Sequence, residues 1–134
     1  MARATLDQFK TEHFATIGSE FGTFYCNTKE KVLKFQIWDA AGDKTYQSVT
    51  KIFFKNAHAI FLCFDLANEE SFDSCRSWLN LVNDPLTIVY LVGTKSDQPR
   101  EVQFQTALEF ARKEKIKKYF ETSAKSGENV QDLF

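Results

Sequence analysis

Two nearly continuous apolar segments, residues 57–65 (AHAIFLCFD) and 87–93 (TIVYLVG), constrain the fold of this 134-residue chain more than any other feature. Apolar runs without alternation are typical of strands in a parallel sheet that is buried on both faces. Parallel strands are joined by crossover connections, which are usually helices. We therefore expect helices to cover both faces of the sheet that contains these runs.

The segments around the two runs alternate between strand and helix patterns. Apolar residues alternate with polar ones over residues 33–37, which indicates a half-buried strand. Apolar residues that recur three and four positions apart indicate amphipathic helices. The expected elements are a hairpin of residues 21–27 and 33–37 turning at 28–31, helices over 71–82 (with Ser71 before the first apolar residue) and 100–115 (opened by Pro99 and Glu101), a short strand over 118–121 and a third helix from Asn129.

This alternation predicts a doubly wound α/β fold with a mostly parallel sheet. Ligands of such sheets bind in loops outside the carboxyl ends of the strands. The length fits one domain, and the sequence shows no linker rich in Gly or Pro that would divide it. We therefore expect a single domain over residues 1–134 whose chemistry lies in the strand-end loops.

Composition and charge exclude several classes of protein. Hydrophobic residues make up 43% and charged residues 26%, which excludes a disordered chain and a membrane bundle. The net charge of -1 provides no global basic field, so we expect no nucleic-acid partner and only local binding of anions. The N-terminus lacks a signal peptide, and three cysteines without metal spacing suit reduced thiols. A cytoplasmic location follows as an expectation.

The first strand-end loop, residues 38–43, pairs Asp39 with a glycine three positions later. An aspartate here can orient a metal-bound water, and Gly42 can offer an unhindered backbone N–H to a phosphate. A turn-forming aspartate is the more common explanation of this pattern on its own.

The loops at residues 93–97 and 121–125 carry the more specific pattern. A carboxylate at Asp97 can accept two hydrogen bonds from the N1–H and N2–H₂ edge of guanine, which adenine lacks. The stem of Lys95 can cover one face of the purine. The backbone N–H groups of the small turn Ser123-Ala124-Lys125 can approach the base oxygen. From these residues alone, a solvated lysine, a helix-capping aspartate and an ordinary turn explain the pattern equally well.

Four motifs in this order make the chain resemble the small Ras-like GTPases, and within them the Rab proteins. They are TIGSEF (16–21), KFQIWDAAG (34–42), TKSD (94–97) and ETSAK (121–125). Further segments that resemble Rab proteins are residues 45–50, 53–57 and 62–65. Several spaced motifs in the right order are far more specific than any one of them.

The resemblance implies guanine nucleotides, GTP and GDP, with Mg²⁺. By motif, Thr16 would contact Mg²⁺ and the γ-phosphate, Asp39 would hold a magnesium-bound water, and Gly42 would contact the γ-phosphate. Phe9 would pack on the guanine, although a core position at a helix end suits it equally. Thr94, Lys95, Asp97, Ser123, Ala124 and Lys125 would form the base site.

The resemblance also implies effectors and regulators as partners, bound through Ile17 to Phe21, Trp38 and Asp43 to Thr50. A core position is the alternative for Phe21, Trp38 and Tyr46, most of all for Trp38. Rab proteins act in vesicle traffic on the cytoplasmic face of membranes, to which a lipidated tail attaches them. The chain ends at Phe134 without such a tail.

The chain departs from the family pattern in three places. A phosphate-binding GxxxxGK[ST] loop would stand before Arg3, and with it a first strand between the hairpin and the 57–65 strand. We expect nucleotide affinity to collapse without this loop and two sheet edges to lack a partner, so that the domain is incomplete. Asp43 replaces the glutamine that orients the attacking water, which predicts slow GTP hydrolysis. Thr94 replaces an asparagine, a milder change.

Two other functions compete with a nucleotide switch. A module of the same fold could act by binding Rab partners without cycling nucleotide, as the missing loop and Asp43 favour. A metal-dependent hydrolase built on Asp39, Asp65 and Asp97 has little support, because no His or Glu joins them. The two histidines, His13 and His58, are expected in a loop and at a strand start.

Overall fold

The computed structural model describes residues 2–12, 14–55 and 57–134. The chain divides into two compact units, Met1–Phe53 with Phe134 and Phe54–Leu133, and each is described by itself. His13 lies outside the described residues. His58 directly precedes a strand, and its carbonyl accepts a hydrogen bond from the backbone N–H of Ile88 at 3.0 Å, in line with the predicted strand start.

The first unit is organised around an antiparallel hairpin, as predicted. The strands pair in a register that sets Phe21 opposite Trp38. Thr28 closes the turn, since its backbone N–H donates to the carbonyl of Lys31 at 2.9 Å and its Oγ1 accepts from the N–H of Lys31 at 3.0 Å. The elements are α1 (Ala2–Leu6), β1 (Ser19–Asn27), β2 (Val32–Ala40), the 3₁₀ helix η1 (Lys44–Tyr46) and α2 (Gln47–Phe54), whose last residue begins the second unit.

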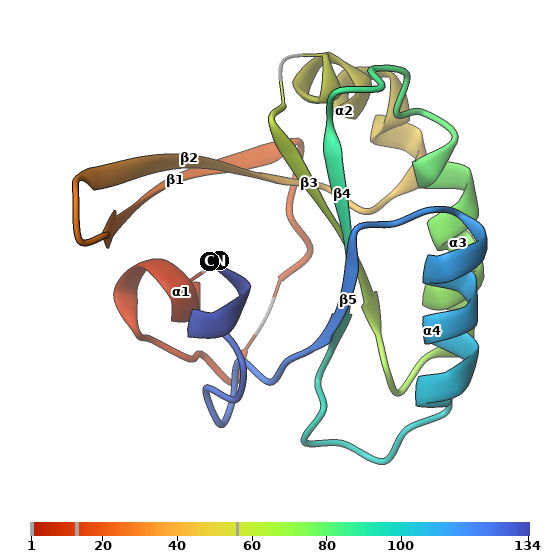
Figure 1. Ribbon diagram of the computed structural model, residues 1–134. Helices are drawn as coiled ribbons and strands as arrows, with labels where there is room; N and C mark the ends of the chain where they lie inside the picture. Colours follow the sequence, from red (N-terminus) through yellow and green to blue (C-terminus); the bar gives the residue numbers. More distant parts are fainter. Residues whose placement is uncertain (1, 13, 56) are drawn as a thin grey trace. The chain divides into compact units, whose positions relative to one another are not determined.

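The second unit is a three-stranded parallel sheet with helices between the strands (Figure 1). The strand order β3-β4-β5 follows the chain. The short strand predicted over residues 118–121 is observed with those bounds. The elements are β3 (Ala59–Asp65), α3 (Glu69–Leu79), β4 (Ile88–Thr94), α4 (Phe104–Lys113), β5 (Lys118–Glu121) and the 3₁₀ helix η2 (Gln131–Leu133).

Both long helices of this unit, α3 and α4, lie on the same face of its sheet (Figure 1). Leu62, Phe64 and Leu91 point to that face and form the core together with Cys75 of α3 and Ala107 of α4. The opposite face carries the rings of Phe61, Tyr90 and Phe120, and Cys63 there is exposed. Within the described residues of this unit, the two long helices thus cover one face of the sheet, while Val92 on the other face is also buried.

The predicted bounds of the helices were wrong. Helix α3 begins at Glu69 rather than at Ser71, because Asn68 Oδ1 accepts the N–H of Ser71 at 3.0 Å and caps an earlier start. Helix α4 begins at Phe104 because the N–H groups of Glu101 and Val102 both donate to the carbonyl of Leu66, which holds them outside the helix.

The third predicted helix, from Asn129, is only the short turn η2. Asn129 has a φ of 54°, which a helix does not accept, and its Nδ2 donates to the carbonyl of Glu121 at 2.9 Å. The short helices α1 and α2 were not predicted.

The two sheets end at the two strands that were predicted to lack a partner. Among the described residues β2 pairs with β1 alone and β3 with β4 alone. β2 and β3 are thus edge strands of their sheets among the described residues.

Gly93 in β4 provides a test of packing in the second unit. A Cβ at this position would stand 2.9 Å from Leu66 Cδ2 and 3.1 Å from the Tyr119 hydroxyl. We expect Gly93→Ala to lower the free energy of unfolding by about 1–2 kcal/mol, because overpacking forces neighbours to move. Gly42→Ala is the matched control, since a Cβ there meets nothing within 4 Å. Urea unfolding of both variants measures the difference, and equal stabilities would contradict this account of the core.

Candidate functional site

The loops that follow β4 and β5 adjoin at the carboxyl ends of these strands, as predicted. The N–H of Thr122 donates to the carbonyl of Gly93 at 2.8 Å, and the N–H of Ser96 donates to the carbonyl of Thr122 at 3.0 Å. These bonds extend the parallel pairing beyond the strands and hold the TKSD and ETSAK segments side by side. The hydroxyl of Thr94 donates to the carbonyl of Phe64 at 2.8 Å and ties the same edge to β3.

Asp97 and Ser123 meet directly. The Ser123 hydroxyl, which is completely buried, donates to Asp97 Oδ1 at 2.6 Å, while Asp97 itself is exposed. This hydrogen bond, helped by the positive charges of Lys125 and Lys95, holds the pKa of the Asp97 carboxyl below its ordinary value. The site thus presents a fixed, ionised carboxylate to solvent at neutral pH.

The backbone of Ser123 is already engaged within its loop. Its N–H donates to the carbonyl of Glu128 at 3.1 Å, and its carbonyl accepts from Gly127 at 2.8 Å. Its Oγ also accepts the N–H of Ser126 at 3.1 Å. Ser123 therefore orients the aspartate through its hydroxyl, and its own N–H belongs to the loop.

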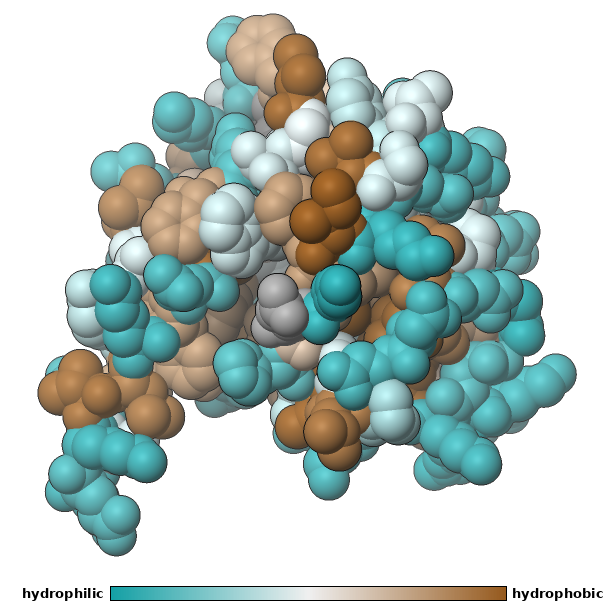
Figure 2. Space-filling model, turned by 90° about the horizontal axis from the view of Figure 1, so that it is seen from above, coloured by the Kyte–Doolittle hydropathy of each residue, from teal (hydrophilic) through white to brown (hydrophobic). Residues whose placement is uncertain are grey.

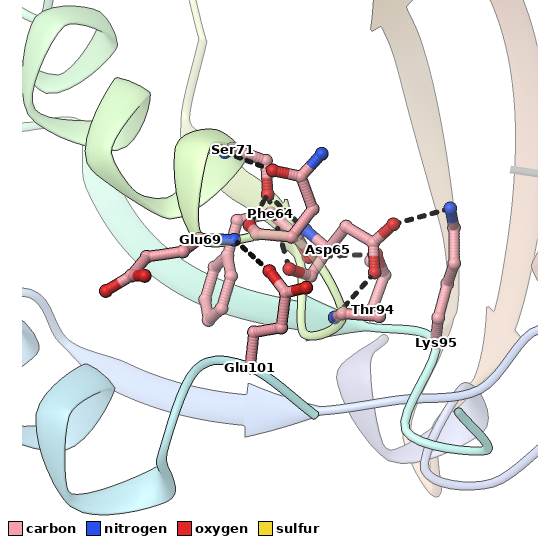
Figure 3. Close-up of polar contacts among 9 residues, drawn as sticks. Phe64, Asp65, Glu69, Ser71, Thr94, Lys95 and Glu101 are labelled. Carbon is pink, nitrogen blue, oxygen red and sulfur yellow. Dashed lines mark hydrogen bonds and ion pairs between the residues drawn. The ribbon is translucent and has the colours of Figure 1, made fainter. Parts of the chain in front are cut away.

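Lys95 is held by an ion pair that the sequence reading missed. Its Nζ lies 2.6 Å from Asp65 Oδ2, at the end of β3 (Figure 3). Asp65 is fixed in turn, because its Oδ1 accepts the N–H of Ala67 at 2.9 Å and its N–H donates to Ser71 Oγ at 2.9 Å. Lys95 has a φ of 61°, in the left-handed region. Asp65 thus serves as a positioning residue for Lys95.

A second ionic group, formed by Arg100, Glu121 and Tyr119, links the end of β5 to the segment after the TKSD loop. Arg100 donates to both carboxylate oxygens of Glu121, at 3.0 and 2.8 Å, and the Tyr119 hydroxyl donates to Oε1 at 2.7 Å. Burial opposes ionisation of Glu121, but the hydrogen bonds from Arg100 and Tyr119 outweigh it and hold the pKa of Glu121 below its ordinary value. Burial together with the bond to Glu121 raises the pKa of Tyr119.

The residues assigned to the phosphate and the metal lie in the first unit. The N–H of Ala41, just after β2, donates to the carbonyl of Gly18, just before β1, at 2.8 Å. The segment before β1 that carries Thr16 and the end of β2 that carries Asp39 therefore adjoin at the open end of the hairpin. Asp39 lies within β2, paired with Glu20, so the loop predicted over residues 38–43 begins only after Ala40. Hydroxyl and carboxylate oxygens are hard ligands that suit Mg²⁺, so these two side chains fit the implied ion in kind. Among the described residues, no three His, Cys, Asp or Glu side chains form a metal-binding cluster.

Asp43 caps η1. Its Oδ1 accepts hydrogen bonds from both the backbone N–H and the hydroxyl of Thr45, each at 2.8 Å. These two bonds lower the pKa of the Asp43 carboxyl. The side chain at the position of the family's glutamine is therefore ionised and engaged with its own loop.

Two aromatic residues, for which either a binding role or a core position was expected, are exposed rather than in the core. Phe9 is 44% exposed and Trp38 is 53% exposed. Trp38 contacts Phe21 at 4.9 Å and stacks on Phe53 at 5.1 Å between ring centroids. A core position, which was the alternative for both, is thus disfavoured.

The comparisons with known proteins agree with this geometry. The sequence model of the Ras family matches residues 1–134. The chain is 39% identical to the Ras-related protein RABA1c of Arabidopsis thaliana over 140 residues, and 37% identical to the human Ras-related protein Rab-4B over 133 residues. These alignments cover 100% and 96% of this chain.

The chain belongs to the Ras family, and its α/β architecture is that of a Ras-like domain. The relatives that it matches are Rab proteins. It spans 64% of the length of RABA1c and 62% of that of Rab-4B, somewhat less than two thirds of each.

Proposed function

We propose that this chain forms part of a Rab-type guanine-nucleotide switch that binds GTP and GDP with Mg²⁺ and acts in vesicle traffic. The observation that supports it best is the pair of Asp97 and Ser123, in which a buried hydroxyl fixes an exposed carboxylate beside the strand ends. A carboxylate so placed can accept both donors on the guanine edge, and adenine would leave it unpaired.

The other residues have roles that agree with this proposal. Lys95, held by Asp65, would lie along the purine, with Ala124 and Lys125 at its edge and the exposed ring of Phe9 stacking on it. Thr16 and Asp39 would hold Mg²⁺, which neutralises phosphate charge when bound, and Gly42 would approach the terminal phosphate. Ionised Asp43 would repel that phosphate, so hydrolysis would be slow.

The experiment that tests base recognition is a titration of the purified chain with GDP and with ADP, followed by the amide NMR signals of residues 94–97 and 121–125. Residues 1–134 contain no GxxxxGK[ST] segment to hold the phosphates. We therefore expect the dissociation constants of both nucleotides for this chain to be no better than millimolar. GDP should bind at least about tenfold more tightly than ADP, because Asp97 would accept two hydrogen bonds that adenine cannot donate. Equal binding of the two nucleotides would overturn the proposal.

One observation favours a second function, that of an interaction module that does not cycle nucleotide. Phe21 and Trp38 are each about half exposed and in ring contact, which gives the hairpin an aromatic surface for a protein partner. In the switch, effectors and regulators would use this surface together with Ile17 and the segment from Asp43 to Thr50, at the cytoplasmic face of a membrane. The module is favoured if Trp38→Ala abolishes capture of a partner whose binding is the same with GDP, GTP or neither.

A further inference from the structure

The segment from Arg112 to Lys118, which runs from the end of α4 to the start of β5, concentrates positive charge that the net charge of the chain conceals. Five of its seven residues are basic, and all five are exposed. The one acid, Glu114, pairs with Arg76 of α3 at 2.8 Å, so it does not offset its lysine neighbours. A helix C-terminus attracts cations only within its last turn, which accounts for Arg112 and Lys113 but not for the lysines beyond them.

These lysines lie beside exposed apolar side chains at the end of the unit where the parallel strands begin. A pocket of about 230 Å³ brings Lys115 and Lys117 together with Ile88 and with Leu79 of α3. The N–H of Lys117 donates to the carbonyl of Val89 at 2.9 Å, which fixes the two segments to each other. Figure 1 shows the loop before β4 and the loop between α4 and β5 at this same end.

The apolar part of this surface is unusually open. Leu86, in the loop before β4, is 85% exposed, and Ile88 is 43% exposed. In the space-filling view from above, hydrophobic side chains lie exposed beside hydrophilic ones (Figure 2). Ile88, Lys115 and Lys117 line the pocket, and Leu86 and Lys113 each stand two residues from one of them in sequence. We call these five residues the basic-apolar surface. Asp84 is the acid nearest to Leu86 in sequence. Its Oδ1 accepts a hydrogen bond from the backbone N–H of Leu86 at 2.9 Å.

We propose that the basic-apolar surface binds directly to membranes that contain anionic phospholipids. Clusters of lysine are attracted to the negative surface of such membranes, and neighbouring apolar side chains can insert at the level of the headgroups. Lysine is a hydrated point charge that suits a diffuse anionic surface, whereas paired carboxylates on a protein favour the bidentate fork of arginine. The surface lies at the end of the strands opposite the loops of Asp97 and Ser123, so it does not depend on nucleotide binding.

The test is flotation of the purified chain with vesicles of equal parts phosphatidylserine and phosphatidylcholine, against vesicles of phosphatidylcholine alone. We expect binding to the first and not to the second. Each lysine near an anionic surface contributes about fivefold in affinity, so Lys113→Gln, Lys115→Gln and Lys117→Gln together should weaken binding about 100-fold. Lys29→Gln, Lys31→Gln and Lys34→Gln in the hairpin remove the same charge from exposed positions and should leave binding unchanged.

The apolar contribution separates a membrane from an acidic protein. Leu86→Ser should weaken vesicle binding about tenfold, because the leucine side chain would no longer insert into the lipid, without changing the binding of soluble polyglutamate. Absence of flotation, or an equal loss in the hairpin control, would overturn the proposal. The proposal would also be overturned if the chain bound polyglutamate as tightly as vesicles and Leu86→Ser had no effect on vesicle binding. That result would assign the surface to an acidic protein.

Discussion

Replacing Arg100 by alanine lowers the free energy of unfolding of the second unit by about 1–2 kcal/mol, because Glu121 is partly buried while the guanidinium is partly exposed and screened by water. The Glu121 side chain is only 17% exposed and accepts from both Arg100 and Tyr119. Without the guanidinium, this carboxylate keeps its desolvation cost and loses two charged hydrogen bonds. Urea unfolding at neutral pH measures the change. Arg112→Ala, at an exposed position, is the matched control and should stay within about 0.5 kcal/mol of the parent.

The same network predicts a dependence on pH. The pKa of Glu121 is lower in the folded chain than its ordinary value of 4.5, so the unfolded chain binds the proton more tightly. The stability that Glu121 contributes is therefore complete above pH 4.5 and is lost as the pH falls through its folded pKa. Glu121→Gln removes this dependence, so the parent and the variant should converge on acidification. Parallel stability curves between neutral and acidic pH would show that Glu121 does not carry the effect.

The sequence predicted strands and the hairpin well because their signals are local. Alternation over residues 33–37 and the apolar runs each fix a strand without reference to the rest of the chain. Helix ends were less accurate, because they depend on contacts that are distant in sequence. Residues 101 and 102 stay outside α4 since the carbonyl of Leu66, in another loop, takes their N–H groups. No periodicity in residues 100–115 reveals such a bond.

In the candidate site, too, the features with a local signal were predicted and those that depend on distant contacts were not. The rule that ligands lie at the carboxyl ends of parallel strands was enough to place Asp97 and Ser123 together. It did not find Asp65 as the partner of Lys95 or Arg100 as the partner of Glu121, because an ionic pairing depends on side-chain rotamers. The cap at Asp43 could have been recognised, since an aspartate two residues before a threonine at a helix start is a familiar capping pattern.

The strongest test of base recognition is Asp97→Ala, which we expect to weaken binding of GDP at least about tenfold, to the level of ADP, and to leave binding of ADP unchanged. The aspartate would accept two hydrogen bonds from guanine, at about 1.5 kcal/mol or more each for a charged acceptor, and adenine has no matching donors. Asp73→Ala removes an exposed aspartate from α3 and serves as the matched control. NMR titration follows binding even in the millimolar range.

Ser123→Ala separates the orientation of the carboxylate from its presence. The variant keeps Asp97 but loses the 2.6 Å hydrogen bond that fixes it, so GDP binding should fall about fivefold, or roughly 1 kcal/mol, because the carboxylate is less well oriented toward the base. The pKa of Asp97 should rise toward its ordinary value, because the Ser123 hydroxyl is the main cause of its lowering. Carboxyl NMR titration of Asp97 measures that rise independently of any nucleotide. If Asp97→Ala weakens GDP and ADP equally, the carboxylate supports the loop rather than reading the base, and the guanine preference must originate elsewhere.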